Sequence, residues 1–304
     1  STTCAASPST AAVSGASGLV GSALTPFLTT GGHTVKPLSR REGVDGAIAW
    51  PDPERLDPAA LAGVDAVVHL AGETVAQRWT DAAKARIMDS RVVRTRALAE
   101  AIAAMPKPPK VLVCASAIGF YGDTGDGWVD EGAPAGDDFL AEVCQAWEAA
   151  CQPARDAGVR VVNLRIGVVL SPDGGALAKL LTPFKLGVGG PVGGGKQYMS
   201  WVALDDVVGA IHHALADERL SGPVNAVSPA PVTNAEFSKT LGRVLGRPAF
   251  LPAPAFALKL AFGEMAEHTV LAGQRVKPSE LTQSGYRFRL PDLEQALRAV
   301  LGRA

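Results

Sequence analysis

The strongest indication of chemistry comes from three glycines spaced three residues apart, Gly15, Gly18 and Gly21. They lie between an apolar run at Thr10–Ser14 and a helical pattern that begins near Leu19. Glycine at such a junction permits a tight turn, lets a diphosphate approach the backbone, and lets the helix pack closely on the strand. The amides of the helix N-terminus then face the anion. This spacing predicts binding of a dinucleotide, with a purely structural turn as the alternative.

The segment after the second apolar run indicates which dinucleotide is bound. That run ends in Ser39, Arg40 and Arg41, and the first acidic residue after it is Glu42. Proteins that bind NAD usually place Asp or Glu here to hold the ribose 2′-hydroxyl. A guanidinium instead suits a 2′-phosphate, to which it donates paired charge-assisted hydrogen bonds. The three residues therefore predict NADP, with NAD as the alternative cofactor and a solvated arginine pair as the structural interpretation.

Strand-like apolar runs alternate with helical patterns through the first half of the chain, which is typical of a parallel sheet with crossover helices. The predicted strands are Thr10–Ser14, Thr34–Ser39, Ala66–Leu70, Lys110–Ala115 and Val159–Arg165, and helices are predicted to begin near Leu19, Ala82 and Asp138. We expect an α/β fold, a Rossmann-type doubly wound sheet with a smaller C-terminal α/β lobe. Residues 1–170, with 200–228 returning to them, should form the NADP-binding domain, and 171–199 and 229–304 the lobe.

The second half of the chain carries a different pattern. Ser171–Lys196 is rich in glycine and is expected to form loops, and Asp205–Ala216 is expected to be a helix capped by Asp205 or Asp206. Thr233 and Glu236 have the spacing of a capping box, and Gly246 should end the helix that follows. The apolar stretch 252–265 is either a contact helix or, as its composition favours, part of the core.

Composition excludes several classes of protein. Of 304 residues, 47% are hydrophobic and 19% charged, and the net charge is −1, which indicates a globular chain and gives no support for a nucleic-acid partner. Apolar runs are too short to span a bilayer. The four cysteines and five histidines lack metal-ligand spacing, so we expect no metal and a reducing compartment.

Longer blocks of sequence resemble a known family. They are VSGASGLVGSAL, DAVVHLAGETVAQRWTDAAKARIMDSRVVRT, ASAIGFYGD, FLAEVCQAWEAA, LRIGVVLSPDGGAL and GGPVGGGKQYMSWVALDD. The chain resembles the extended short-chain dehydrogenases/reductases and, within them, the NAD-dependent epimerase/dehydratase family, group 39U, which has plastid and bacterial members. The resemblance covers nearly the whole chain. The resemblance implies the fold of this family and a bound dinucleotide. The substrate of the group is unknown.

The resemblance also implies which residues contact the cofactor. The pyrophosphate is expected against the glycine turn, at Gly15, Ser17, Gly18, Leu19, Val20 and Gly21. The rest of the cofactor, from the 2′-phosphate to the nicotinamide, is expected against Arg40, Leu70, Ala71, Gly72, Ser116 and Gly167.

One departure from the family is plain: no Tyr-x-x-x-Lys occurs in the chain, and Leu140 and Cys144 stand in those places. In the family that pair transfers a proton, because the lysine lowers the tyrosine pKa. Tyr121, Glu73 and Ser116 are the replacement candidates for catalysis, and Arg165 is a candidate anion clamp for the substrate. Their structural alternatives are a loop-packing tyrosine, a backbone cap and an ion pair.

Two functions therefore remain open. The first is an NADP(H)-dependent oxidoreductase or epimerase of unknown substrate. The second is a non-catalytic dinucleotide-binding module that docks on a protein partner, such as a plastid thylakoid, photosystem or division complex. Residues 1–12 are rich in Ser, Thr and Ala without acidic residues, which resembles the end of a transit peptide, although Arg is missing and a cloning remnant is the alternative. We expect the chloroplast stroma or the stromal side of the thylakoid, and otherwise the cytoplasm.

Overall fold

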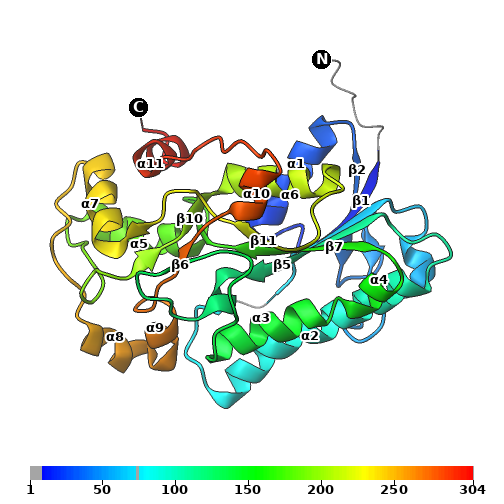
Figure 1. Cartoon of the computed structure of the whole chain (residues 1–304), viewed down its shortest axis with the longest axis horizontal. Coiled ribbons are helices and arrows are strands. Elements are labelled where there is room, and N and C mark those ends of the chain that lie inside the picture. The colour runs from blue at the N-terminus through cyan, green and yellow to red at the C-terminus, as the bar shows by residue number, and fades with distance from the viewer. Residues whose placement is uncertain (1–8, 73–74, 304) are drawn as a thin grey trace.

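A seven-stranded parallel sheet forms the centre of the computed structural model, which describes residues 9–72 and 75–303 (Figure 1). The strand order is β11-β7-β5-β4-β1-β2-β3. The strands are β1 Thr10–Ser14, β2 Thr34–Ser39, β3 Ile48–Ala49, β4 Ala66–His69, β5 Val111–Ala117, β7 Arg160–Ile166 and β11 Gly222–Ala226. The chain proceeds outward from β1 to one edge and then from β4 to the other. This is the doubly wound order, which confirms the predicted Rossmann-type fold.

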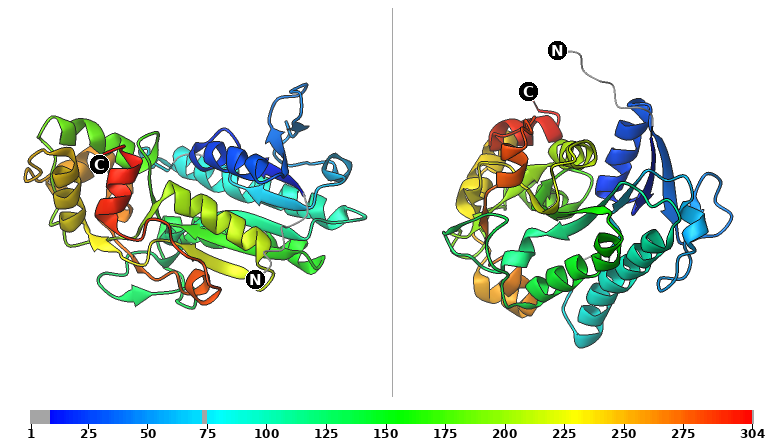
Figure 2. Two further views of the ribbon diagram at one scale, coloured as in Figure 1. Left: turned by 90° about the horizontal axis from the view of Figure 1, so that it is seen from above. Right: turned by 45° about the vertical axis from the view of Figure 1, so that its right-hand side comes forward.

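Helices cover both faces of this sheet (Figures 1 and 2). On one face lie α1 Leu19–Thr30 and α6 Leu204–Ala216, and on the other α2 Asp81–Ala104, α3 Phe139–Ala149 and α4 Gln152–Asp156. Each face encloses its own core: Leu24 and Ile211 belong to the first, and Leu98 and Leu112 to the second. The predicted strands and helix starts agree with the observed ones to within two residues at each compared end.

The remaining elements lie outside the seven-stranded sheet and its two helix layers. They are η1 Pro58–Leu61, η2 Ile118–Tyr121, β6 Trp128–Val129, β8 Val168–Leu170, α5 Gly175–Lys185, β9 Tyr198–Met199, β10 Trp201–Ala203, β12 Val232–Thr233, α7 Asn234–Leu245, α8 Ala255–Phe262, α9 Glu264–His268, β13 Arg275–Val276, α10 Ser279–Gln283 and α11 Leu293–Val300. Buried side chains of α5, α7 and α11 form a third core. The expectation of loops through Ser171–Lys196 misses α5, which forms because Leu177, Leu181 and Phe184 bury one face at helical spacing.

The two helix caps predicted in this half have different outcomes. The capping box of Thr233 and Glu236 is present, and Gly246 ends α7 with a φ of 64°. The cap predicted for α6 is wrong, because Ala203 occupies that position and makes no side-chain cap bond. Asp206 is instead buried, and its carboxylate accepts hydrogen bonds from the segment that follows α10.

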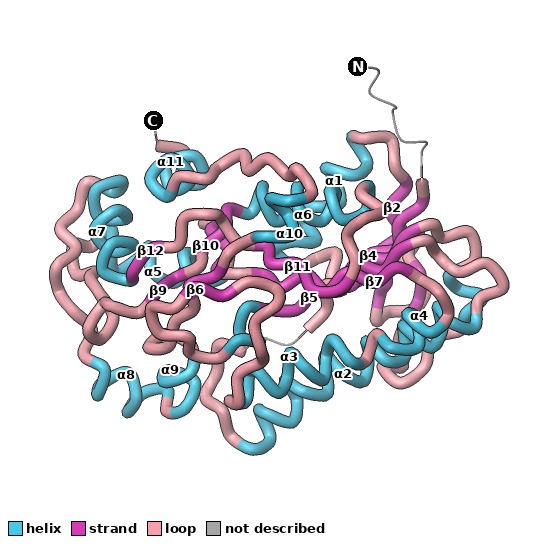
Figure 3. The backbone as a smooth tube through the Cα atoms, in the orientation of Figure 1, coloured by secondary structure: helices cyan, strands magenta, loops and turns pink. Residues whose placement is uncertain are grey.

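Helix α8 departs most from expectation (Figure 3). Core packing was the favoured interpretation of its apolar sequence, and it is wrong: α8 has no buried residue, and Phe256 and Leu260 are 75% and 80% exposed. Every residue of the helix except Lys259 is apolar, yet among the described elements its main contact is with α9. Among the described residues, no helix has both the length and the apolar character needed to cross a bilayer.

Candidate functional site

Five neighbouring strands place the predicted cofactor residues along one edge of the sheet. Arg40 follows β2, Gly15 follows β1, Leu70 follows β4, Ser116 lies near the end of β5, and Gly167 follows β7. Because all these strands are parallel, their carboxyl ends meet at the same edge. Ligands of doubly wound sheets bind there, where the strand order reverses, which in this chain is between β1 and β4.

The glycine turn leaves no room for side chains on its inner side. A Cβ on Gly21 would lie 2.1 Å from the carbonyl oxygen of Gly15, and a Cβ on Gly15 would lie 2.9 Å from the carbonyl carbon of Leu70. Gly15 also has a φ of 67°, which only glycine adopts readily. Gly18 is the N-cap of α1 and supplies no side-chain cap, while Ser17 and Gly18 are exposed. The turn therefore presents backbone to an incoming group, as a diphosphate requires.

A buried hydrogen-bond chain that sequence reasoning missed holds the neighbouring loop in place. The Ser14 hydroxyl accepts from the amides of Leu70, at 2.9 Å, and Ala71, at 3.3 Å. It lies 2.5 Å from Nδ1 of His69, whose Nε2 lies 2.9 Å from the Thr95 hydroxyl. Since the Ser14 oxygen already accepts twice, its proton goes to Nδ1, and Nε2–H donates to Thr95.

The buried imidazole of this chain is neutral. His69 is fully buried, and burial, followed by the nearby Arg94 charge, lowers its pKa to about 4. A neutral ring keeps one nitrogen as donor and the other as acceptor, which the chain from Ser14 to Thr95 requires. The only sequence signal for this contact was a polar residue at the end of each of two buried strands.

Tyr121 and Arg165 lie in contact, each with further partners. The Arg165 guanidinium donates to the Tyr121 hydroxyl at 3.0 Å and pairs with both carboxylate oxygens of Glu148, at 2.8 and 3.0 Å. Tyr121 in turn donates to Asn225 Oδ1 at 2.7 Å, and Arg165 lies 3.5 Å from the centre of the Phe120 ring. Tyr121 and Arg165 are 4% and 3% exposed, and burial raises the pKa of Tyr121. Arg165 thus forms the ion pair that was its structural alternative.

The places of the missing tyrosine and lysine are apolar and lie against the end of β5. The Cys144 thiol is 3.6 Å from the Ala117 carbonyl oxygen, and a Cβ on Gly119 would lie 3.4 Å from the Leu140 Cβ. Burial raises the pKa of Cys144 to about 12, so neither side chain exchanges protons near neutrality. Ser116 is 3% exposed, and its hydroxyl neighbours the Cys144 thiol but makes no hydrogen bond of normal geometry within residues 9–72 and 75–303. Glu73 lies outside the described residues.

The C-terminal lobe closes against the same region. His268 of α9 lies 3.6 Å from the Asp138 carboxylate, which also caps α3, and its ring stacks on Trp79 at 6.4 Å. Lys84 of α2 pairs with Glu264 at 2.7 Å. These contacts join α9 to α2 and to the N-terminus of α3, the helix that carries Leu140 and Cys144.

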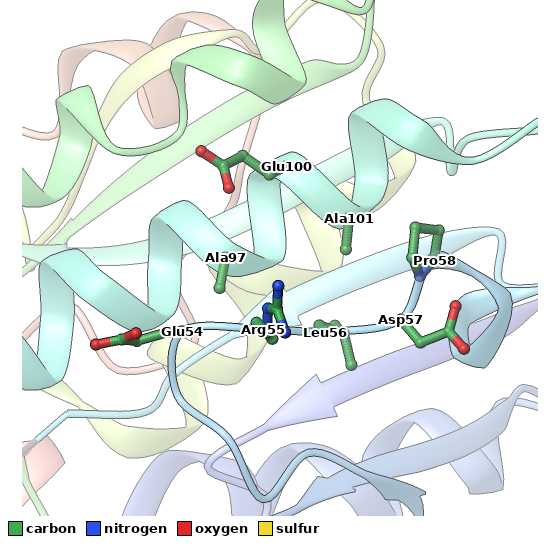
Figure 4. Close-up of a pocket in the computed structure, with 8 residues that line it drawn as sticks. All are labelled: Glu54, Arg55, Leu56, Asp57, Pro58, Ala97, Glu100 and Ala101. Atoms are coloured by element: carbon green, nitrogen blue, oxygen red, sulfur yellow. The ribbon is translucent and has the colours of Figure 1, made fainter.

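A shallow hollow of about 470 Å³ lies between residues 54–58 and α2 (Figure 4), and none of the predicted cofactor residues lines it. Its lining consists of Glu54, Arg55, Leu56, Asp57, Pro58, Ala97, Glu100 and Ala101. Three carboxylates and one guanidinium make this lining unfavourable for a phosphate. The hollow is therefore not the candidate dinucleotide site.

Comparison with known proteins identifies a family and similar structures that cover nearly the whole chain. The NAD dependent epimerase/dehydratase family matches residues 11–226, and a domain of unknown function, DUF1731, matches residues 253–300. An epimerase family protein of Mycobacterium bovis is 46% identical over 94% of this chain and 95% of its own length. A chloroplastic SDR39U1 homologue of Arabidopsis thaliana is 38% identical over 96% and 86%. The crystal structure of human epimerase family protein SDR39U1 with NADPH has a TM-score of 0.90 at 37% identity, covering 97% of this chain and all of that one.

Proposed function

Because the chain belongs to the NAD dependent epimerase/dehydratase family, we propose that it binds NADP(H) along the carboxyl edge of its sheet. We further propose that it acts on a small-molecule substrate as an oxidoreductase or epimerase. The observation that carries this proposal is the glycine turn, where a Cβ on Gly21 would come within 2.1 Å of a backbone oxygen. Such close packing exposes the backbone to a diphosphate. The NADPH in the human relative's crystal structure supports the choice of cofactor.

The residues present fit this cofactor in each part. The glycine turn suits the diphosphate, Arg40 and Arg41 are exposed cations beside the expected 2′-phosphate, and Ser39 ends the strand before them. Gly167 has no space for a side chain, since a Cβ there would lie 2.4 Å from the Ser200 carbonyl oxygen. A bound nicotinamide would supply hydride exchange with a substrate carbon.

The protein's own groups must then manage the substrate oxygen without a tyrosine–lysine pair. Ser116 is the group best placed for this role, because it lies near the end of β5 and its hydroxyl has only the weakly hydrogen-bonding Cys144 thiol as a neighbouring side-chain partner among the described residues. We propose that it hydrogen-bonds the reacting group. Tyr121 and Glu73 stay predictions as proton donors or acceptors, as does Arg165 as a substrate clamp, and the Arg165–Glu148 pair supports a positioning role for Arg165.

The test begins with cofactor binding. Titration of the purified protein with NADPH and NADH, followed by nicotinamide fluorescence, should show saturable binding with preference for NADPH. Gly21→Ala should abolish this binding, whereas Gly194→Ala, where a Cβ meets nothing within 4 Å, should leave it unchanged. Substrate-dependent change at 340 nm across a panel of carbonyl compounds would support catalysis. Absence of dinucleotide binding at millimolar concentration would refute the proposal.

A second candidate function, a non-catalytic module docked on a protein partner, is supported by α8. Phe256 and Leu260 of α8 and Phe250, which precedes the helix, are all more than 70% exposed. Large exposed apolar patches are typical of interaction sites. The native protein should then run in a larger assembly that dissociates when Leu260→Asp is introduced. A lone monomer at every ionic strength would contradict docking.

We also propose a plastid location, which the chloroplastic Arabidopsis relative supports. The bacterial relatives support the cytoplasm as the alternative. Fractionation of source cells, with an antibody against this chain, should place it in the stroma or on the stromal side of the thylakoid. Recovery with cytoplasmic markers alone would contradict the plastid location.

A further inference from the structure

A second guanidinium lies beside the predicted 2′-phosphate position, and it comes from a different element. Arg94 of α2 stacks over the Trp50 ring, with its guanidinium carbon 5.0 Å from the ring centre. The Trp50 backbone amide donates to the Ser39 carbonyl oxygen at 2.6 Å, so Trp50 lies beside the end of β2. Arg40 is the next residue after Ser39. The stacking therefore fixes Arg94 at the strand end that precedes Arg40.

The two guanidiniums lack a counter-charge in direct contact. Within residues 9–72 and 75–303, neither the Arg40 nor the Arg94 side chain has a carboxylate within ion-pair distance or a hydrogen-bond partner. Burial, followed by the charge of Arg40, lowers the pKa of Arg94, and only Asp52 opposes this shift. Two cations held near each other without a partner repel, and an anion between them would relieve that repulsion.

The position along the sheet edge identifies the anion by its chemistry. The diphosphate belongs at the glycine turn after β1, and the end of β2 is where the adenosine ribose of a dinucleotide lies. The charged group at that place is a phosphate on the ribose 2′-oxygen. Guanidinium groups bind phosphates through paired charge-assisted hydrogen bonds, and an aromatic ring beneath one of them restricts its rotation.

We infer that Arg94, positioned over the Trp50 ring, binds the 2′-phosphate of NADP(H) together with Arg40. The inference rests on the proposed cofactor site and adds a specificity-determining residue that the sequence motif after β2 does not contain. Arg91, one turn earlier on α2, points elsewhere: its guanidinium lies 3.1 Å from a Cβ placed on Gly72 and stacks near Trp147.

The experiment compares Arg94→Met, Arg94→Lys and a matched control, Arg96→Met, which removes an exposed arginine from the same helix. Dissociation constants are measured for NADPH and NADH by fluorescence, and for 2′,5′-ADP and 5′-AMP by calorimetry. Arg94→Met should weaken NADPH and 2′,5′-ADP on the order of 10- to 100-fold, as loss of a charge-assisted bond implies, and change NADH by less than about twofold. The dissociation constants of Arg94→Lys for NADPH and 2′,5′-ADP should lie between those of Arg94→Met and the unmodified protein. Those of Arg96→Met should equal those of the unmodified protein.

Equal weakening of NADPH and NADH by Arg94→Met would overturn the inference, because it would indicate a structural or adenine-packing role. No weakening of either would also overturn it. The proposed function fails separately, when the unmodified protein binds neither dinucleotide. Circular dichroism of each variant verifies that the fold is retained, and Arg94→Lys, which keeps the long side chain over Trp50, guards against a packing defect in Arg94→Met.

Discussion

The substitution Glu148→Gln tests whether the Arg165 ion pair is a structural support of the site wall. Glu148 joins α3 to β7 through two hydrogen bonds, of 2.8 and 3.0 Å, to the Arg165 guanidinium. The side chains of Arg165 and Glu148 are 4% and 13% exposed, so solvent screens the pair weakly. Glutamine has nearly the same shape but offers one acceptor oxygen in place of two and carries no charge.

The expected cost follows from what remains after the change. Removing one partner of a buried ion pair costs about 3–5 kcal/mol, because the other charge stays buried without compensation. Arg165 keeps its bond to Tyr121 and the face of Phe120, and glutamine keeps one acceptor, which places the loss near the low end. We therefore expect the free energy of unfolding to fall by about 3 kcal/mol.

The assay is equilibrium unfolding in urea, followed by far-ultraviolet circular dichroism at pH 7. The control is Glu264→Gln, which breaks an ion pair of 2.7 Å to Lys84 whose side chains are 39% and 27% exposed. Exposed ion pairs contribute about 0–1 kcal/mol to stability, so the free energy of unfolding of Glu264→Gln should be almost unchanged. The reasoning would be refuted if both variants lost the same stability, or if Glu148→Gln lost less than about 1 kcal/mol.

Three further predictions concern other buried groups. Tyr121→Phe removes the bond to Asn225 and the acceptor for Arg165, and should lower unfolding stability by about 1–3 kcal/mol in urea titrations while leaving NADPH affinity within about twofold. His69 has its pKa lowered to about 4 in the folded state against 6.5, so the unfolded chain binds more protons between these values. Stability present above about pH 6.5 should therefore decline as pH falls toward 4, less steeply in His69→Gln; equal slopes in urea titrations across this range would contradict it. Cys114, Cys144 and Cys151 are all buried. A thiol reagent at pH 8 should therefore label the folded Cys4→Ser variant only after urea is added. Rapid labelling without urea would contradict the burial of these cysteines.

The sheet and its glycine turn could be predicted because their signals are local. A run of buried apolar residues followed by Gly15, Gly18 and Gly21 prescribes strand, turn and helix within twenty residues. The same holds for the capping box of α7, whose two partners are three residues apart. Where partners are near in sequence, residue type and spacing are enough.

The features that escaped prediction join distant segments. Ser14 and His69 are 55 residues apart, and the contact between them depends on β1 and β4 being neighbours. The apolar sequence of α8 reports composition but not whether another element covers it, and in this fold its apolar face stays exposed. Asp206 is of a residue type that often caps helices and lies in the first turn of α6, yet its carboxylate instead accepts hydrogen bonds from the amides of Arg289 and Leu290.

The carboxylate of Asp206 has a consequence for how the polypeptide is divided. It accepts hydrogen bonds from the Tyr286 hydroxyl and from the amides of Arg289 and Leu290, at 2.7 to 3.0 Å, although it belongs to the helix that flanks the central sheet. A fragment that stops at residue 228 would keep this acid, 1% exposed in the intact chain, while losing every one of those donors. We therefore expect that residues 1–228 do not fold stably alone, because the hydrogen bonds to this buried carboxylate come from residues 286–290. Co-expression of residues 1–228 with the rest of the chain should restore a folded protein.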